Sequence, residues 1–176
     1  NYPATDVTWD GANAYCLAIG RRLPTEAEWE LAARGYDGRI YPWGNEWNQL
    51  LAKTSIPEGN PGPAPVGSYP AGASALGVLD MAGNVAEWVS DWYSPTYYQQ
   101  SEASGLNPQG PQGANSTGVE NNQKVIRGGS WDAKPFFART VHRQSAFQNT
   151  TGSWLGFRCA SSIGENLPLT STPTLF

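Results

Sequence analysis

Glycine and proline interrupt this sequence so often that long helices and strands have little room to form. The chain holds 20 glycines and 14 prolines among its 176 residues, and both residue types favour turns. Residues 36–73 are the clearest case, because turn sequences such as Pro42-Trp43-Gly44-Asn45 occur there with few periodic apolar runs. Eight tryptophans and eight tyrosines can build a core in place of aliphatic residues, since each aromatic side chain buries a large area. We therefore expect one α+β domain made largely of packed loops.

Two short helices are predicted in the first fifth of the chain. Thr8 can cap the first helix and Gly20 can end it. Its buried face should comprise the apolar residues at helical spacing, which are Ala12, Tyr15, Cys16 and Ile19. The second helix begins with a capping box, in which Thr25 accepts from the Glu28 amide and Glu28 reaches back, and it stops at Gly35.

Strands are predicted only in the later part of the chain. Residues 124–127 (KVIR) and 155–160 (LGFRCA) have strand character. Residues 94–122 are polar and rich in Ser, Asn, Gln and Gly, which is typical of an exposed insertion. Residues 163–176 form a separate tail that is expected to act as a strap or to fray.

The charge pattern and the cysteine spacing exclude several classes of protein and site. The formal net charge is −4 and no basic run occurs, so we do not expect a nucleic-acid partner. No stretch approaches the roughly 20 apolar residues that cross a bilayer, so direct membrane insertion is not expected either. Cys16 and Cys159 are too far apart for a metal-binding CxxC motif. Their spacing leaves two interpretations open, a pair of buried thiols or a disulfide that joins the two ends of the domain.

Four motifs occur in a fixed order along the chain. They are VTWDGANAYC at residues 7–16, RLPTEAEWE at 22–30, GVLDMAGNVAEW at 77–88, and RGGSW at 127–131 with GFRC at 156–159. In this order they resemble the formylglycine-generating-enzyme (sulfatase-modifying-factor) family. The resemblance spans residues 1–162, without the family's N-terminal strands. It implies a C-type-lectin-like fold with two short helices, small antiparallel sheets and long packed loops.

The resemblance also indicates that the family's reaction is lost here. The family's enzymes oxidise a substrate cysteine to formylglycine with two cysteines that bind copper as thiolates, which are ligands that suit Cu(I). Alignment on residues 128–131 places Ala133 and Ala138 at those two positions, and alanine can neither bind a metal nor exchange thiols. We therefore expect no copper and no catalytic residues. His142 is the only histidine, so a histidine-rich metal site is excluded, although a Ser–His–acid triad stays open without a motif to mark it.

The segment between GGSW and GFR has an unusual composition. A fixed frame encloses residues without a shared period or polarity, namely Asp132, Ala133, Phe136, Phe137, His142, Gln144 and Phe147. This arrangement resembles the variable proteins of diversity-generating retroelements, which implies a non-catalytic surface that binds a macromolecular ligand, expected to be a protein. In one alternative the phenylalanines belong to the core. In two others the chain is a domesticated non-catalytic domain of a larger signalling or surface protein, or an oxidoreductase with altered chemistry.

Two kinds of cross-link are expected to hold the loops together. Arginines of the frame should pair with glutamates, from the sets Arg127, Arg139, Arg143 and Arg158 and Glu26, Glu28, Glu30 and Glu87. The resemblance implies a disulfide between Cys16 and Cys159. Such a bond would favour a cell-surface, secreted or virion location.

The resemblance further implies a structural calcium ion in the GVLDMAGNVAEW motif. Its ligands would be two carboxylates and two backbone carbonyls, those of Asp80, Glu87, Gly83 and Val85. Calcium prefers oxygen ligands, and Gly83 would let successive carbonyls turn inward. The alternative is that Asp80 and Glu87 cap turns or pair with arginines.

Overall fold

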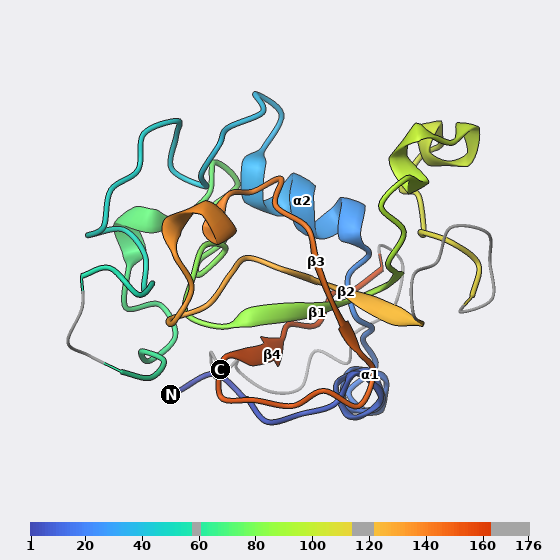
Figure 1. Ribbon diagram of the computed structural model, residues 1–176, viewed down its shortest axis with the longest axis horizontal. Coiled ribbons are helices and arrows are strands. Elements are labelled where there is room, and N and C mark those ends of the chain that lie inside the picture. Colours follow the sequence, from blue (N-terminus) through green and yellow to red (C-terminus); the bar gives the residue numbers. More distant parts are fainter. Residues whose placement is uncertain (58–60, 114–121, 163–176) are drawn as a thin grey trace.

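The computed structural model describes residues 1–57, 61–113 and 122–162 of the chain (Figure 1). The helices are α1 (Trp9–Ala18), α2 (Glu26–Arg34) and the short 3-10 helices η1 (Pro70–Gly72), η2 (Tyr97–Gln99), η3 (Ser101–Ser104) and η4 (Pro135–Ala138). The strands are β1 (Ala86–Trp92), β2 (Gln123–Arg127), β3 (Gln144–Phe147) and β4 (Leu155–Phe157). Over the described ranges, no helix is long and apolar enough to cross a membrane. The predicted α+β class with two short α-helices is confirmed, and the predicted tail at 163–176 lies outside the described residues.

The strands form a four-stranded sheet in the order β3-β2-β1-β4. β1 pairs antiparallel with β2, which places Glu87 opposite Arg127, and β2 pairs antiparallel with β3. The expectation of purely antiparallel sheets is wrong in one respect, because β4 runs parallel to β1. Parallel neighbours need a long connection between them, and here that connection contains β2 and β3. Both predicted strands are present, although the second ends at Phe157.

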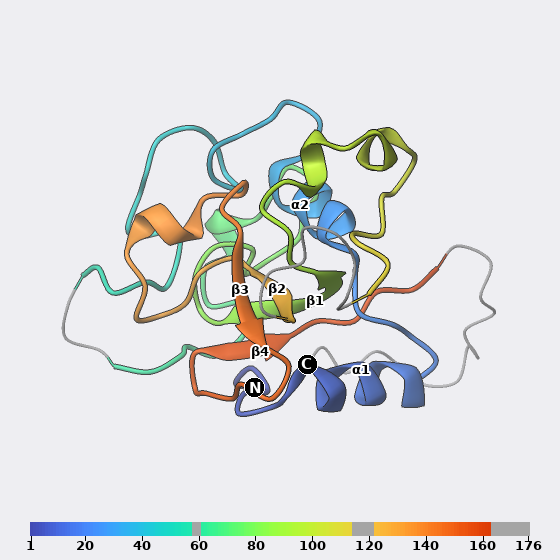
Figure 2. The ribbon, with the colours of Figure 1, turned by 45° about the vertical axis from the view of Figure 1, so that its right-hand side comes forward.

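Each α-helix covers one face of the sheet. In Figures 1 and 2, α2 lies above the sheet and α1 lies below it. The core on the α2 side contains Trp29, Ala33, Met81, Val89 and Val125. The core on the α1 side contains Ala12, Cys16, Trp88, Ile126 and Leu155. Neighbouring strand residues such as Trp88 and Val89 thus face opposite layers, as the pleat of a strand requires.

The predicted helix starts are confirmed by their capping bonds. The Thr8 hydroxyl accepts from the Gly11 amide at 3.1 Å. At α2, Thr25 accepts from the Glu28 amide while the Glu28 carboxylate accepts from the Thr25 amide, so the capping box is complete. These local signals fix where both helices begin.

α1 packs on the sheet through a narrower face than the spacing predicts. Ala12 and Cys16 are fully buried, whereas Tyr15 and Ile19 are 54% and 44% exposed. The small side chains let the helix approach the sheet closely, and the larger ones at the edge of the contact remain at the surface. Cys16 is bonded to Cys159, just after β4, which confirms the predicted disulfide and ties α1 to the end of the sheet.

The polar segment after β1 is largely exposed over its described residues, as predicted, but it is anchored to the domain at a few points. Tyr97 is only 5% exposed. The Asn107 side chain accepts from the Thr25 hydroxyl at 2.7 Å and donates to Glu28 at 3.0 Å. The described part of this segment therefore packs on the N-terminal end of α2, and residues 114–121 lie outside the described ranges.

Candidate functional site

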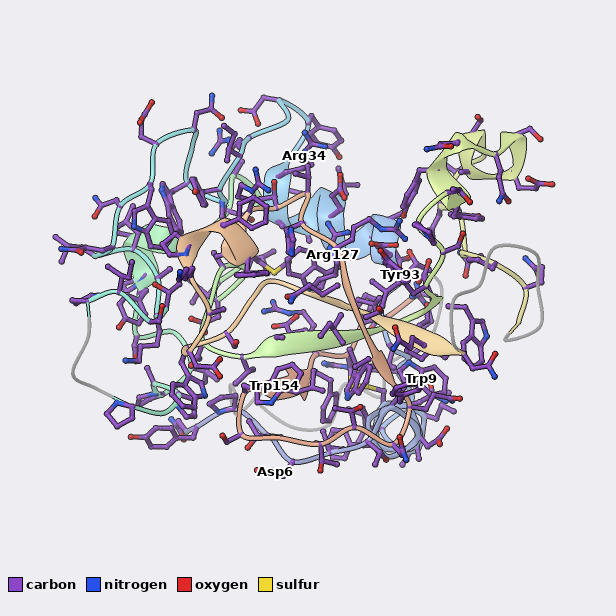
Figure 3. The ribbon with its side chains drawn as sticks, in the orientation of Figure 1. Asp6, Trp9, Arg34, Tyr93, Arg127 and Trp154 are labelled. Atoms are coloured by element: carbon purple, nitrogen blue, oxygen red, sulfur yellow. A yellow bond between two sulfur atoms is a disulfide. The ribbon has the colours of Figure 1, made fainter. Side chains whose placement is uncertain are left out.

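A network of buried ion pairs holds the segment that follows β2. Arg127, at the end of β2, is fully buried and donates to Glu26 and to Glu30. It also donates to the Thr140 carbonyl. Arg143 donates to both carboxylate oxygens of Glu26, at 2.7 and 2.8 Å. Two arginines therefore share one glutamate, and they fix this segment beneath α2, where Figure 3 places Arg127.

The remaining arginines of the frame differ in their partners. Arg158 pairs with Glu87 at 2.6 Å, as expected. Glu28 pairs with an arginine outside the predicted set. Within the described residues, Arg139 forms no ion pair with a glutamate. Its guanidinium lies 3.8 Å from the centre of the Phe136 ring, and its Nε donates to the Phe136 carbonyl.

Gly129 allows the backbone after β2 to approach η4. Its φ of +67° lies in a region that other residues rarely occupy. A Cβ atom at this position would lie 2.9 Å from the carbonyl carbon and oxygen of Phe137. The GGSW motif thus determines where η4 lies, and η4 carries two of the three phenylalanines of the predicted surface, Phe136 and Phe137.

Three aromatic rings gather at η4. The ring centres of Phe136, Phe137 and His142 are 5.0 to 5.5 Å apart, and each pair meets edge to face. Phe136 is 53% exposed, while the other two rings are half-buried. Burial and the charges of Arg139 and Arg127 lower the pKa of His142, so this ring is mostly neutral near pH 7. The exposure of Phe136 argues against the alternative that it belongs to the core.

A cavity of about 220 Å³ lies beside this aromatic cluster. Four of the predicted surface residues line it, namely Asp132, Ala133, Phe137 and Gln144. Three further lining residues were not predicted, namely Ala86, Ser130 and Trp154. The signal for Trp154 is weak, because it is a single tryptophan in a loop before β4 (Figure 3). A hydrogen bond holds the loop of Trp154 next to Trp131, because the Trp131 indole donates to the Ser153 carbonyl at 3.1 Å.

Only one of the two positions aligned with catalytic cysteines lines this cavity. Ala133 lines it. Ala138 is fully buried and packs in a separate cluster with Ala52 and Ala82. A side chain at position 138 therefore faces the interior.

Phe147 is separate from the other predicted surface residues. It is 53% exposed, but it lies at the far end of β3, paired with Gln123. Within the described residues, no ring contact joins it to the cluster at η4. The prediction of one continuous patch therefore applies to the other six residues and not to Phe147.

Two of the four predicted calcium ligands, Asp80 and Glu87, contact Arg158. Arg158 donates to both oxygens of Glu87, and the Trp29 indole donates to the same carboxylate at 2.7 Å. Arg158 also donates to the Asp80 carbonyl. The Asp80 carboxylate accepts from the Gly67 amide at 2.7 Å, and burial raises its pKa.

These contacts match the alternative in which the carboxylates cap turns and pair with arginine. Calcium takes about six to eight oxygen ligands, and the Glu87 oxygens are already bonded to Arg158. In this arrangement the Glu87 carboxylate is occupied by Arg158, so the four residues do not fit a calcium ion. Calcium binding stays a prediction.

A second cavity, of about 290 Å³, lies along α2, between Ala27 and Gly35. Its two cationic lining residues, Arg34 and Arg143, are both ion-paired within the fold, to Glu30 and Glu26. The cavity beside η4 is therefore the better candidate for a ligand site, since its carboxylate, Asp132, forms no ion pair with any residue that the structure describes.

The chain resembles longer proteins over most of its length. It is 42% identical over 163 residues to serine/threonine-protein kinase Pkn1 of Chlamydia trachomatis. The aligned region covers 92% of this chain and 24% of that protein. It is 40% identical over 177 residues to the formylglycine-generating enzyme of Streptomyces coelicolor. This alignment covers 92% of this chain and 53% of that protein. The chain thus spans about half or less of the length of these relatives.

The fold also matches a solved structure, Treponema denticola variable protein 1. The TM-score is 0.73 at 24% identity, over 88% of this chain and 69% of that one. This match shows a shared fold and confirms the expected C-type-lectin-like architecture. The family model of the sulfatase-modifying factor enzyme 1-like domain matches residues 1–163. Together with the motifs at 22–30 and 77–88, this match shows that the chain belongs to the formylglycine-generating-enzyme (sulfatase-modifying-factor) family.

Proposed function

We propose that this chain is a non-catalytic ligand-binding domain that resembles the variable proteins of diversity-generating retroelements. Its binding surface consists of the aromatic cluster at η4 and the adjoining cavity, and its ligand is a protein. The observation that carries this proposal is the exposed Phe136 ring, held edge to face by Phe137 and His142. Rigid, exposed aromatic rings are effective anchors for protein ligands.

The division between framework and surface supports this proposal. Arg127 and Glu26 are at most 1% exposed and hold the segment from beneath. Asp132 and Phe136, by contrast, are exposed and take no part in those ion pairs. Side chains on such a surface can change while the buried pairs keep the fold, because surface substitutions rarely alter stability much.

The residues at the two cysteine positions support a non-catalytic role. Neither Ala133 nor Ala138 can supply the thiolate that Cu(I) prefers, and Ala138 is fully buried. An oxidoreductase with altered chemistry is the competing proposal, and the cavity at Ala133 is the feature that favours it. The purified protein, incubated with Cu(I) and a cysteine-containing sulfatase peptide, should form no aldehyde above a no-protein control. The Streptomyces coelicolor enzyme serves as the positive control.

A second candidate is a non-catalytic domain within a larger signalling or surface protein. The relative named serine/threonine-protein kinase Pkn1 favours it, because the matched region is 24% of that protein. The DNA around the gene separates the two proposals. A reverse transcriptase gene and a near-copy of the gene's 3′ end would support the variable-protein role, whereas kinase-coding sequence in the same reading frame would support the signalling role.

Sequencing the gene from many isolates of the source tests the variable surface directly. Amino-acid changes should concentrate at the predicted surface residues of the cavity and the cluster, with Arg127, Gly129 and Arg143 unchanged. These surface residues are Asp132, Ala133, Phe136, Phe137, His142 and Gln144. Changes spread evenly over the domain would overturn the proposal.

A further inference from the structure

The cavity beside η4 has a carboxylate and no cation among its lining residues. The acidic residue is Asp132, and the described lining contains no lysine or arginine. The Ser130 hydroxyl donates to Asp132 Oδ1 at 2.6 Å. No ion pair to Asp132 is formed by any residue in the described ranges, and the side chain is exposed. Its second oxygen is therefore available to a group from outside the chain.

Two of the residues that line the same cavity, Phe137 and Trp154, are aromatic. Phe137 forms one wall and is held by the rings of Phe136 and His142. Trp154 forms another, and the absence of a side chain at Gly152 makes room for its indole, because a Cβ there would lie 2.5 Å from Trp154 Nε1. Ring faces attract cations and also pack well against alkyl chains.

The volume of the cavity and the charges around it limit the kinds of ligand that it can hold. At about 220 Å³ the cavity lies below the usual range for a drug-sized molecule, which is roughly 300 to 1,000 Å³. A single side chain is therefore the better match. The depressed pKa of His142 keeps a competing positive charge off the rim near pH 7. Arg139 is held over Phe136 by its bond to that residue's carbonyl. Lys134, the residue after Ala133, is exposed and is not among the residues that line the cavity.

We propose that this cavity receives a lysine or arginine side chain of the protein partner. The alkyl stem lies between Phe137 and Trp154, and the cationic head binds the free oxygen of Asp132. Gln144, which also lines the cavity, can accept a further hydrogen bond from the head through its amide oxygen. This inference rests on the proposed binding function and adds the chemistry that selects the partner.

The test is an NMR titration of the whole chain with single capped amino acids. The cationic probes are N-acetyl-lysine methylamide and N-acetyl-arginine methylamide. Their neutral counterparts are the capped norleucine and citrulline, which keep the stem and lose the charge. We expect saturable shifts of the Trp154 indole and the Gln144 side-chain amide with a cationic probe, and the two cationic arms show whether lysine or arginine is preferred.

Asp132→Asn should weaken the binding of the cationic probe by up to about fivefold, since an exposed ion pair contributes up to about 1 kcal/mol. The matched control is Glu102→Gln. It removes the same charge from η3, an exposed turn that lies away from η4 in Figures 1 and 2, and it should leave the binding unchanged.

Equal binding of charged and neutral probes, or no change in Asp132→Asn, would overturn the inference. So would a complete lack of saturable shifts with either cationic probe. If these results occur while variation between isolates still concentrates at the cluster, the inference fails and the proposed binding function stands. Variation spread evenly over the domain would instead remove the proposed function itself.

Discussion

Arg127 and Glu26 form an ion pair in which neither side chain is more than 1% exposed. The pair joins the end of β2 to the first turn of α2, across 101 positions of sequence. Because Arg143 binds the same carboxylate, Glu26 is the point at which the binding segment is attached to the helical layer. Glu26 is thus the one carboxylate that both arginines share, while Glu30 gives Arg127 a second partner.

Replacing Glu26 with glutamine should destabilise the protein by up to roughly 3–5 kcal/mol, because Arg143 loses its carboxylate and the buried Arg127 keeps only that of Glu30. The free energy of unfolding in urea measures this loss. Asp37→Asn is the control, since Asp37 pairs with Arg39 but is 58% exposed at its side chain. The control should be nearly neutral, and a similarly small loss in Glu26→Gln would show that the buried pair does not hold the framework.

Replacing both Phe136 and Phe137 with serine should abolish capture of the protein ligand that the wild type captures. Phe136 is 53% exposed, so Phe136→Ser alone should change stability by about 1 kcal/mol or less. Phe137 is half-buried and should account for most of any loss in the double variant. Thermal unfolding together with a ligand-binding assay separates these two effects.

Phe147→Ser provides a matched control for the aromatic cluster. Phe147 has the same 53% exposure as Phe136 but lies at the far end of β3. Ligand binding should survive this substitution. Loss of binding in Phe147→Ser would show that the surface extends along β3, and a large loss of stability in Phe136→Ser would place that ring in the core.

The sequence predicted the structural features that depend on residues close together along the chain, such as the helix caps. The caps at Thr8 and Thr25 are confirmed because each uses atoms within one turn of its own helix. The disulfide between Cys16 and Cys159 is confirmed as well, although residue spacing alone left it open and the family resemblance supplied it.

Features that depend on distant contacts were harder to predict. The parallel pairing of β4 with β1 follows from the path of the whole chain. Trp154 enters the cavity only because its loop folds back toward Trp131. Arg139 was expected to pair with a glutamate like its neighbours, but it stacks on Phe136, and no spacing rule distinguishes these outcomes.

Calcium binding at Asp80, Gly83, Val85 and Glu87 remains to be tested. If the ion binds the folded chain, calcium should raise the melting temperature, because a ligand of the native state stabilises it by mass action. Asp80→Ala should then erase the rise. Equal melting temperatures in calcium and in excess chelator would instead leave Arg158 as the cation that balances Glu87.

Asp91 is the buried acid whose protonation should alter stability most clearly. It is 1% exposed at the end of β1, and Oδ2 accepts from the Glu26 amide at 2.7 Å. Oδ1 has no hydrogen-bond partner among the residues of the described ranges, and Gly110 packs directly against it. Burial accordingly raises the pKa of Asp91 to about 6.

A carboxyl whose pKa is raised by folding binds more protons in the folded state than in the unfolded state. Stability must therefore fall as the pH rises from about 4.5 to about 7, by on the order of 2 kcal/mol from Asp91 alone. The raised pKa of Asp80 acts in the same direction, and the lowered pKa of Glu28 acts in the opposite direction at lower pH. Comparing wild type with Asp91→Asn isolates the contribution of Asp91, because the other groups are common to both. Urea unfolding at several pH values should show a smaller fall in the variant over this interval, whereas parallel curves would mean that Asp91 titrates as an ordinary carboxyl.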